Sequence, residues 1–64
     1  MYGKIKFFDK LKHFGFITED DTNKDWFFHI SGLVDPDVWN GDKVSFIEGV
    51  GKKGESIAVK VTKL

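Results

Sequence analysis

The stretch KHFGFI, residues 12–17, places two phenylalanines on either side of a glycine, next to a lysine and a histidine. Successive side chains of a β-strand point to opposite faces, so Phe14 and Phe16 would share one face, and Gly15 and Ile17 the other. The aromatic pair therefore either fills the core of a small β-structure or stands on its surface to receive a flat ligand. The neighbouring strands decide between these interpretations.

β-Forming residues recur along the chain in short segments that are separated by turn residues. No segment shows sustained helical periodicity, and residues 31–42 are interrupted by glycine, proline and an Asn-Gly pair. The adjacent Phe7 and Phe8 break the alternation of the first segment, which predicts a β-bulge there. Five short strands favour a small closed all-β barrel, because closure removes exposed sheet edges. The expected strands cover residues 2–9, 14–19, 26–30, 43–48 and 56–63.

The third expected strand, WFFHI, indicates which face is buried. Trp26 and Phe28 lie on one face, whereas Phe27 and His29 lie on the other. Burying an imidazole without a partner costs roughly a few kcal/mol, so we expect Trp26 and Phe28 to face inward. The candidate core residues are then Ile5, Ile17, Trp26, Phe28, Leu33, Val44, Ile57, Val59 and Val61.

This assignment leaves an aromatic cluster in solvent, made of Phe14, Phe16, Phe27 and His29. A single phenylalanine in a strand is more often a core residue, but an exposed group of three with a histidine usually marks a binding surface. Single-stranded nucleic acid suits such a surface, because each base can stack on a ring for about 1–3 kcal/mol while lysines follow the phosphates. The competing interpretation is a protein-interaction module whose exposed rings dock a peptide or a second copy of the chain.

Charge is distributed unevenly although the formal net charge is zero. Residues 1–17 carry four lysines and one acid, residues 18–51 two lysines and eight acids, and residues 52–64 four lysines and one acid. The three segments therefore sum to about +3, −6 and +3, so the protein can have a basic side. Arginine, the commonest bidentate reader of guanine edges, is absent.

The composition also narrows the class of protein. There is no cysteine, so disulfides and thiolate metal sites are excluded. A metal site or a nucleophilic active site is not expected at His29, because the only other histidine is His13 and no nucleophile is evidently placed beside it. Ser31 is expected to bond local backbone. No segment resembles a membrane span or a signal peptide. We expect one domain over residues 1–64, cytoplasmic, non-enzymatic and without cofactor or metal.

Two longer stretches carry a family resemblance. GKIKFFDKLKHFGFI (residues 3–17) followed by DWFFHIS (residues 25–31) resembles the cold-shock domain, as do GDKVSF (41–46) and AVKVTK (58–63). The resemblance implies a five-stranded antiparallel barrel of the oligonucleotide-binding (OB) fold. It also implies binding of single-stranded RNA and DNA with low sequence specificity, as an RNA chaperone. An RNA-recognition motif shares the F-x-F pattern but needs helices that this chain lacks. We expect a monomer, with a homodimer as the alternative.

Position by position, the resemblance implies particular roles. Phe7 would be a stacking aromatic, Phe8 would contribute an edge, and Asp25 would accept a hydrogen bond from a base. The implied nucleic-acid-binding residues are Lys6, Phe7, Phe8, Lys12, Phe14, Phe16, Asp25, Phe27 and His29.

Four departures from the family pattern stand out. Phe7 replaces a common tryptophan, and Ile30 replaces a common aromatic, which would remove one base subsite. His13 replaces a glycine, at a cost if the backbone there has positive φ. The loop over residues 34–41 is short and lacks the usual phenylalanine. Trp39 either substitutes for that phenylalanine or caps the barrel, and we favour the cap.

Overall fold

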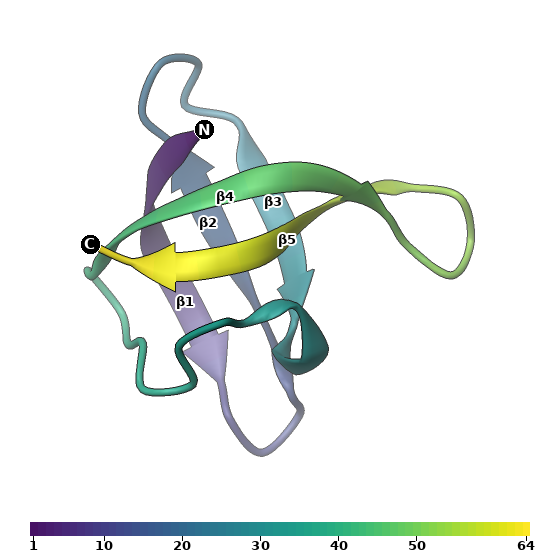
Figure 1. Ribbon diagram of the computed structural model, residues 1–64, viewed down its shortest axis with the longest axis horizontal. Helices are drawn as coiled ribbons and strands as arrows, with labels where there is room; N and C mark the ends of the chain where they lie inside the picture. Colours follow the sequence, from purple (N-terminus) through teal and green to yellow (C-terminus); the bar gives the residue numbers. More distant parts are fainter.

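The computed structural model describes residues 1–64 and consists of five strands and one turn of 3-10 helix (Figure 1). The expected bounds of the first, second and fifth strands are confirmed, and the fourth strand is two residues longer than expected. The third strand begins one residue before its expected start, at Asp25, and ends one residue early, because the chain turns into the helical segment at Ile30. The elements are β1 (Tyr2–Asp9), β2 (Phe14–Glu19), β3 (Asp25–His29), η1 (Ile30–Gly32), β4 (Lys43–Val50) and β5 (Ser56–Lys63).

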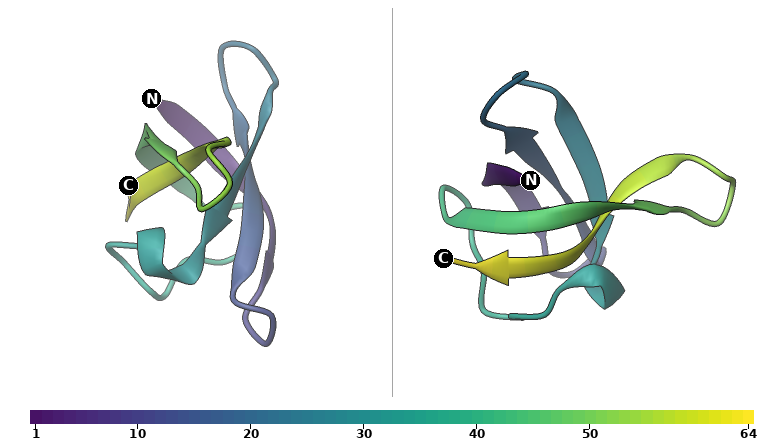
Figure 2. Two further views of the ribbon diagram at one scale, coloured as in Figure 1. Left: turned by 90° about the vertical axis from the view of Figure 1, so that its right-hand side faces the viewer. Right: turned by 45° about the horizontal axis from the view of Figure 1, so that its top comes forward.

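The strands form one antiparallel sheet in the order β3-β2-β1-β4-β5, which confirms the expected five-stranded OB-type architecture. The sheet curls so that β4 and β5 cross over β1, β2 and β3 (Figure 1). Seen from the side, the three-stranded and two-stranded parts face each other as two layers (Figure 2). The core lies between these layers, and the outer face of β1, β2 and β3 points away from it.

The hydrogen-bonded sheet does not close completely, in contrast to the closed barrel expected from the sequence. Strands β3 and β5 lie near each other but share no ladder, and they are the two ends of the strand order. Residues after η1 are bonded to β5 instead: Leu33 bridges Val61, the Val34 N–H donates to the Val61 carbonyl at 2.8 Å, and the Lys63 N–H donates to Asp35 Oδ2 at 2.8 Å. Strand β5 also carries an extra residue at Lys60 (φ +51°), which bends it. We call the unbonded gap between β3 and β5 the seam.

The predicted bulge in β1 is confirmed. The β1–β2 register shifts between Ile5 and Phe7, so that Lys6 is the extra residue. Lys6 and Phe7 both point outward, and Phe8 then turns inward with an exposed fraction of 2%. The bulge therefore accommodates two adjacent phenylalanines on opposite faces of one strand.

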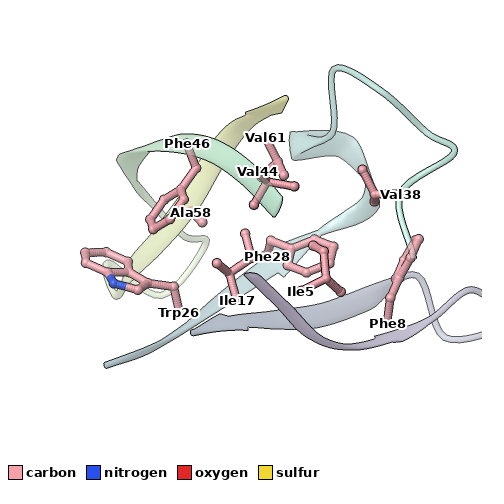
Figure 3. Close-up of a cluster of buried hydrophobic side chains, with 10 residues drawn as sticks. All are labelled: Ile5, Phe8, Ile17, Trp26, Phe28, Val38, Val44, Phe46, Ala58 and Val61. Carbon is pink, nitrogen blue, oxygen red and sulfur yellow. The ribbon is translucent and has the colours of Figure 1, made fainter. Parts of the chain in front are cut away.

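Ten side chains form the core (Figure 3). Six of the nine expected core residues are among them, including Trp26 and Phe28, which confirms the facing of β3. Leu33 is half-buried and packs against this cluster, whereas Ile57 and Val59 are half-buried residues beside the seam and were wrongly expected in the core. The bulges explain this error, since they shift the alternation on which the expectation depended. The core residues that the sequence analysis did not identify are Phe8, Val38, Phe46 and Ala58.

Gly15, at the centre of KHFGFI, allows β1 and β3 to approach β2 closely. It is buried opposite Phe8 and Phe28 in the strand register. A Cβ at this position would overlap the Phe7 carbonyl oxygen and lie 2.6 Å from the end of the Phe28 ring. Only glycine fits, so the stretch packs β2 against its neighbours with Gly15 and presents Phe14 and Phe16 on the opposite face.

Candidate functional site

The strand register brings phenylalanines of three strands together on the outer face of the sheet. Phe7 of β1 is paired with Phe16 of β2, which is paired in turn with Phe27 of β3. Phe14 lies in the next row, where its partner on β3 is His29. We call Phe7, Phe14, Phe16 and Phe27 the phenylalanine platform.

The four rings of the platform form one connected cluster. Phe14 and Phe27 are stacked, with ring centroids 5.8 Å apart and planes at 19°. Phe16 meets both of them edge to face, at 6.1 Å and 5.9 Å, and Phe7 meets Phe14 at 6.0 Å. Such offset and T-shaped contacts are the favoured arrangements of aromatic pairs. Each ring of the cluster is thus supported by at least one neighbouring ring.

The platform is open to solvent, as the facing of β3 predicted. Phe7 is 42% exposed, while the other three rings are half-buried because they pack against one another. Phe8, which the resemblance placed at the edge of the site, is a core residue. The bulge at Lys6 directs the Phe8 ring inward, so Phe8 is not one of the rings that the structure brings together on the outer face.

An ion pair borders the platform at Asp25. The Lys6 ammonium donates to Asp25 Oδ2 at 2.7 Å, and the Thr18 hydroxyl donates to Asp25 Oδ1 at 2.9 Å. These two hydrogen bonds hold the pKa of the Asp25 carboxyl below its ordinary value, and the bond from Lys6 has the larger effect. The Lys6 charge is thus engaged within the protein, and a phosphate must compete with Asp25 for it.

His29 is held in a defined orientation by Ser31. The Ser31 backbone N–H donates to His29 Nδ1 at 3.1 Å, and the Ser31 hydroxyl lies 2.9 Å from the same nitrogen. A backbone N–H can only donate, so we assign the proton of the neutral ring to Nε2. The exposed side of the imidazole then presents a hydrogen-bond donor next to Phe14 and Phe27. Ser31 was expected to bond local backbone, but its hydroxyl bonds the histidine instead.

Lys12 lies in the exposed turn that follows β1, at the end of the platform. Its backbone N–H and that of Leu11 both donate to Asp9 Oδ1 at 3.0 Å, so this turn is locally ordered. The Lys12 side chain has no acidic partner in the structure and is free to meet a ligand anion.

Trp39 covers Phe8 at the end of the barrel, as favoured from the sequence. The two ring centroids are 6.4 Å apart, and the Lys10 ammonium lies 5.2 Å from the centre of the indole ring. About half of the Trp39 surface, 51%, stays exposed. The Trp39 ring thus covers Phe8 while part of its surface remains open to solvent.

Two of the departures from the family pattern have a structural consequence. His13 adopts the left-handed conformation, with φ at 66°, which is a strained position for a residue other than glycine. Ile30 belongs to η1 and packs partly against the core, so it adds no ring to the platform.

The geometry favours recognition of flat, uncharged rings connected by negative charges. The structure brings no three potential metal ligands together. None of its helical structure has the length and hydrophobicity required to cross a membrane. The contacts that sequence reasoning missed, Thr18 with Asp25 and Ser31 with His29, depend on strand register and on the turn after β3.

The chain is similar to known proteins over its whole length. Residues 1–64 match the family described as the 'Cold-shock' DNA-binding domain. The "Cold shock-like protein CspA" of Vibrio cholerae is 39% identical over 67 aligned residues, which cover 100% of this chain and 94% of that protein. The "Cold shock-like protein CspE" of Escherichia coli is 39% identical, over 88% of this chain and 86% of that protein. "Cold shock protein 1" of Arabidopsis thaliana is 38% identical, over 94% of this chain and 21% of that protein.

Proposed function

Because this chain belongs to the cold-shock DNA-binding domain family, we propose that its phenylalanine platform binds single-stranded RNA and DNA with little sequence preference. The observation that carries the proposal is the connected cluster of four outward rings on three adjacent strands. Every base has an aromatic face, so stacking on such rings tolerates any sequence. A duplex hides these faces, so it should bind far more weakly than a single strand.

The residues around the platform have complementary roles in this proposal. Phe7, Phe16 and Phe27 lie in one row and would stack successive bases. His29 would donate from Nε2 to a base oxygen, and Lys12 would contact a phosphate. Because Lys6 is paired with Asp25, it would contribute once the ligand separates the pair or bonds both partners.

The same binding would make the protein an RNA chaperone. A ligand that associates only with unpaired bases shifts the equilibrium of an RNA hairpin toward the open form. No covalent chemistry, cofactor or metal is needed for this activity, and we propose that the protein acts by binding alone, as a monomer in the cytoplasm.

A titration with oligothymidine over a series of salt concentrations tests the proposal. For single strands, log affinity falls with log salt by about 0.7 for each phosphate neutralised, so a few lysine contacts give a slope of about −1 to −3. The same sequence as a duplex and a panel of scrambled peptides serve as controls. A slope near zero, or tighter binding of a peptide, would instead favour a protein-interaction module.

A further inference from the structure

The connection between η1 and β4 covers a part of β1 that has no strand partner on that side. Strand β4 pairs with β1 only over Tyr2–Lys4, and the connection then passes beside the second half of β1 (Figure 1). The Ile5 N–H donates to the Asp42 carbonyl at 2.9 Å, and the Gly41 N–H donates to the Ile5 carbonyl at 2.7 Å. The turn at residues 39–42 thus takes the place of a missing strand.

The side chain of Asn40 completes this contact. Its Oδ1 accepts a hydrogen bond from the Phe8 N–H at 3.0 Å. Within the turn, the Asp42 N–H donates to the Trp39 carbonyl at 3.1 Å, and the Trp39 N–H donates to Asp42 Oδ2 at 2.9 Å. Gly41 has φ at 89°, a conformation that glycine adopts without strain. Three hydrogen bonds to β1 and two within the turn therefore hold Asn40 and Gly41 in place.

An asparagine followed by glycine is chemically reactive. Asparagine is a labile residue, and glycine has no side chain to obstruct attack by its own nitrogen. The Gly41 nitrogen attacks Cγ of Asn40, the bond from Cγ to Nδ2 breaks, and Nδ2 leaves as ammonia with the proton from the Gly41 nitrogen. Water then opens the resulting succinimide. Opening at Cγ gives an aspartate, and opening at the main-chain carbonyl gives an isoaspartate.

Water has access to this pair in the folded protein, but the reacting groups are engaged. Asn40 and Gly41 are both exposed, and beyond the neighbouring residues no heavy atom lies within 4 Å of the position that a Gly41 Cβ would take. The Gly41 nitrogen must lose its proton to attack, yet its N–H is bonded to the Ile5 carbonyl. The amide of Asn40 is held by the Phe8 N–H. The reaction should therefore begin only after the turn leaves β1.

We propose that Asn40 is a site of spontaneous deamidation, and that release of the 39–42 turn from β1 controls its rate. The turn is then a local unit that opens more easily than the whole domain. The aspartate product keeps the main chain and an oxygen that accepts from the Phe8 N–H. The isoaspartate product has one additional carbon in the main chain, which moves Gly41 away from the Ile5 carbonyl. Deamidation thus yields two forms, of which the isoaspartate form has the weaker cover on β1.

The experiment follows loss of side-chain amides during incubation at neutral pH, in buffer and in guanidinium chloride. The chain has two asparagines, Asn23 and Asn40, and no glutamine, and cleavage after lysine separates them on peptides 13–24 and 25–43. Mass spectrometry should show deamidation of Asn40 in guanidinium chloride, and a rate at least about tenfold lower in buffer, which corresponds to an opening that costs about 1.4 kcal/mol or more. Asn23 precedes a lysine and is the internal control, which should keep its amide for longer.

Two variants distinguish release of the turn from unfolding of the whole domain. Asp42→Ala removes the hydrogen bond from the Trp39 N–H and loosens the turn, whereas Ile17→Val shortens a core side chain of β2. Each is incubated in buffer at the same interval below its own melting temperature. Asp42→Ala should deamidate at Asn40 several-fold faster than Ile17→Val. Lys63→Gln controls for the ion pair that Asp42 also makes, at 3.6 Å, and should behave as the wild type.

The outcomes decide both parts of the proposal. If Asn40 keeps its amide in guanidinium chloride, it is not a deamidation site. Equal rates in buffer and in guanidinium chloride, or equal rates for Asp42→Ala and Ile17→Val, would show that the turn does not control the reaction.

Hydrogen exchange of the Gly41 N–H, measured by NMR, gives a readout that does not depend on the chemistry. Asp42→Ala should accelerate this exchange by the same factor as deamidation. The isolated isoaspartate form should have a lower urea midpoint than Asn40→Asp, and equal midpoints would contradict the role of the turn in covering β1.

Discussion

Phe27 and Phe28 are neighbours on β3, but removing their rings should have different consequences. Loss of the Phe28 ring should mainly reduce stability, and loss of the Phe27 ring should mainly weaken binding. Phe28 is fully buried in the core, with an exposed fraction of 0%. Truncating a buried phenylalanine costs about 3–5 kcal/mol. At about 0.05–0.15 kcal/mol per residue, a domain of this length has a total stability of about 3–10 kcal/mol. Phe28→Ala should therefore remove a large part of the stability and leave much of the protein unfolded.

Phe27→Ala should spare most of the stability and weaken binding. Its ring contacts Phe14 and Phe16, and each aromatic pair contributes about 0.5–1.5 kcal/mol, so the loss of stability should be about 1–3 kcal/mol. Loss of one stacked base weakens binding by about 1–3 kcal/mol. That corresponds to roughly a 5-fold to 150-fold increase in Kd.

Urea denaturation followed by circular dichroism measures the stability, and oligothymidine titration measures Kd for the folded variants. Tyr2→Ala is the matched control, because Tyr2 is an exposed aromatic residue of β1 outside the platform, and its Kd should equal that of the wild type. If Phe27→Ala unfolds the protein while Phe28→Ala stays folded and loses affinity, the platform has been assigned to the wrong face. A stable Phe27→Ala variant with unchanged Kd would show that ligand does not stack on this ring.

Three further predictions concern other parts of the structure. Trp26 is only 6% exposed, so any quenching of tryptophan emission by oligothymidine should come from Trp39, and strong quenching that survives Trp39→Phe would contradict the facing of β3. His13→Gly should raise the free energy of unfolding by about 0.5–1 kcal/mol, and with it the urea midpoint, because φ at this residue is 66°. A lower midpoint would mean that the histidine side chain stabilises the fold by more than the backbone strain costs. The pKa of Asp25 is lowered from its ordinary 3.8 by Lys6 and Thr18, so its stabilising effect is complete above the unfolded pKa and is lost as the pH falls through the lower folded value. The difference in urea midpoint between wild type and Asp25→Asn should therefore be constant near neutral pH, begin to fall as the pH drops below 3.8 and vanish below the lowered pKa of folded Asp25. A difference that persists there would exclude ionisation of Asp25 as its cause.

The sequence by itself determined the strands and the two faces of β3. The alternation of side chains in WFFHI and the cost of burying a histidine were enough to place Phe28 inside and Phe27 outside. The adjacent phenylalanines of β1 indicated a bulge, which the register confirms. These inferences succeeded because alternation, turn composition and burial cost act within one short segment.

Only the tertiary structure decided which residues the bulges redirect and which charges meet. Phe8 is buried because the extra residue at Lys6 resets the alternation, and two adjacent aromatics in the sequence do not show which of them turns inward. The pairing of Lys6 with Asp25 joins residues 19 positions apart and depends on the register of three strands. The seam exists because β3 and β5 approach without forming a ladder, which is a property of the whole curled sheet. Local patterns carry no information on such distant contacts, since these depend on how the strands are aligned and bent relative to one another.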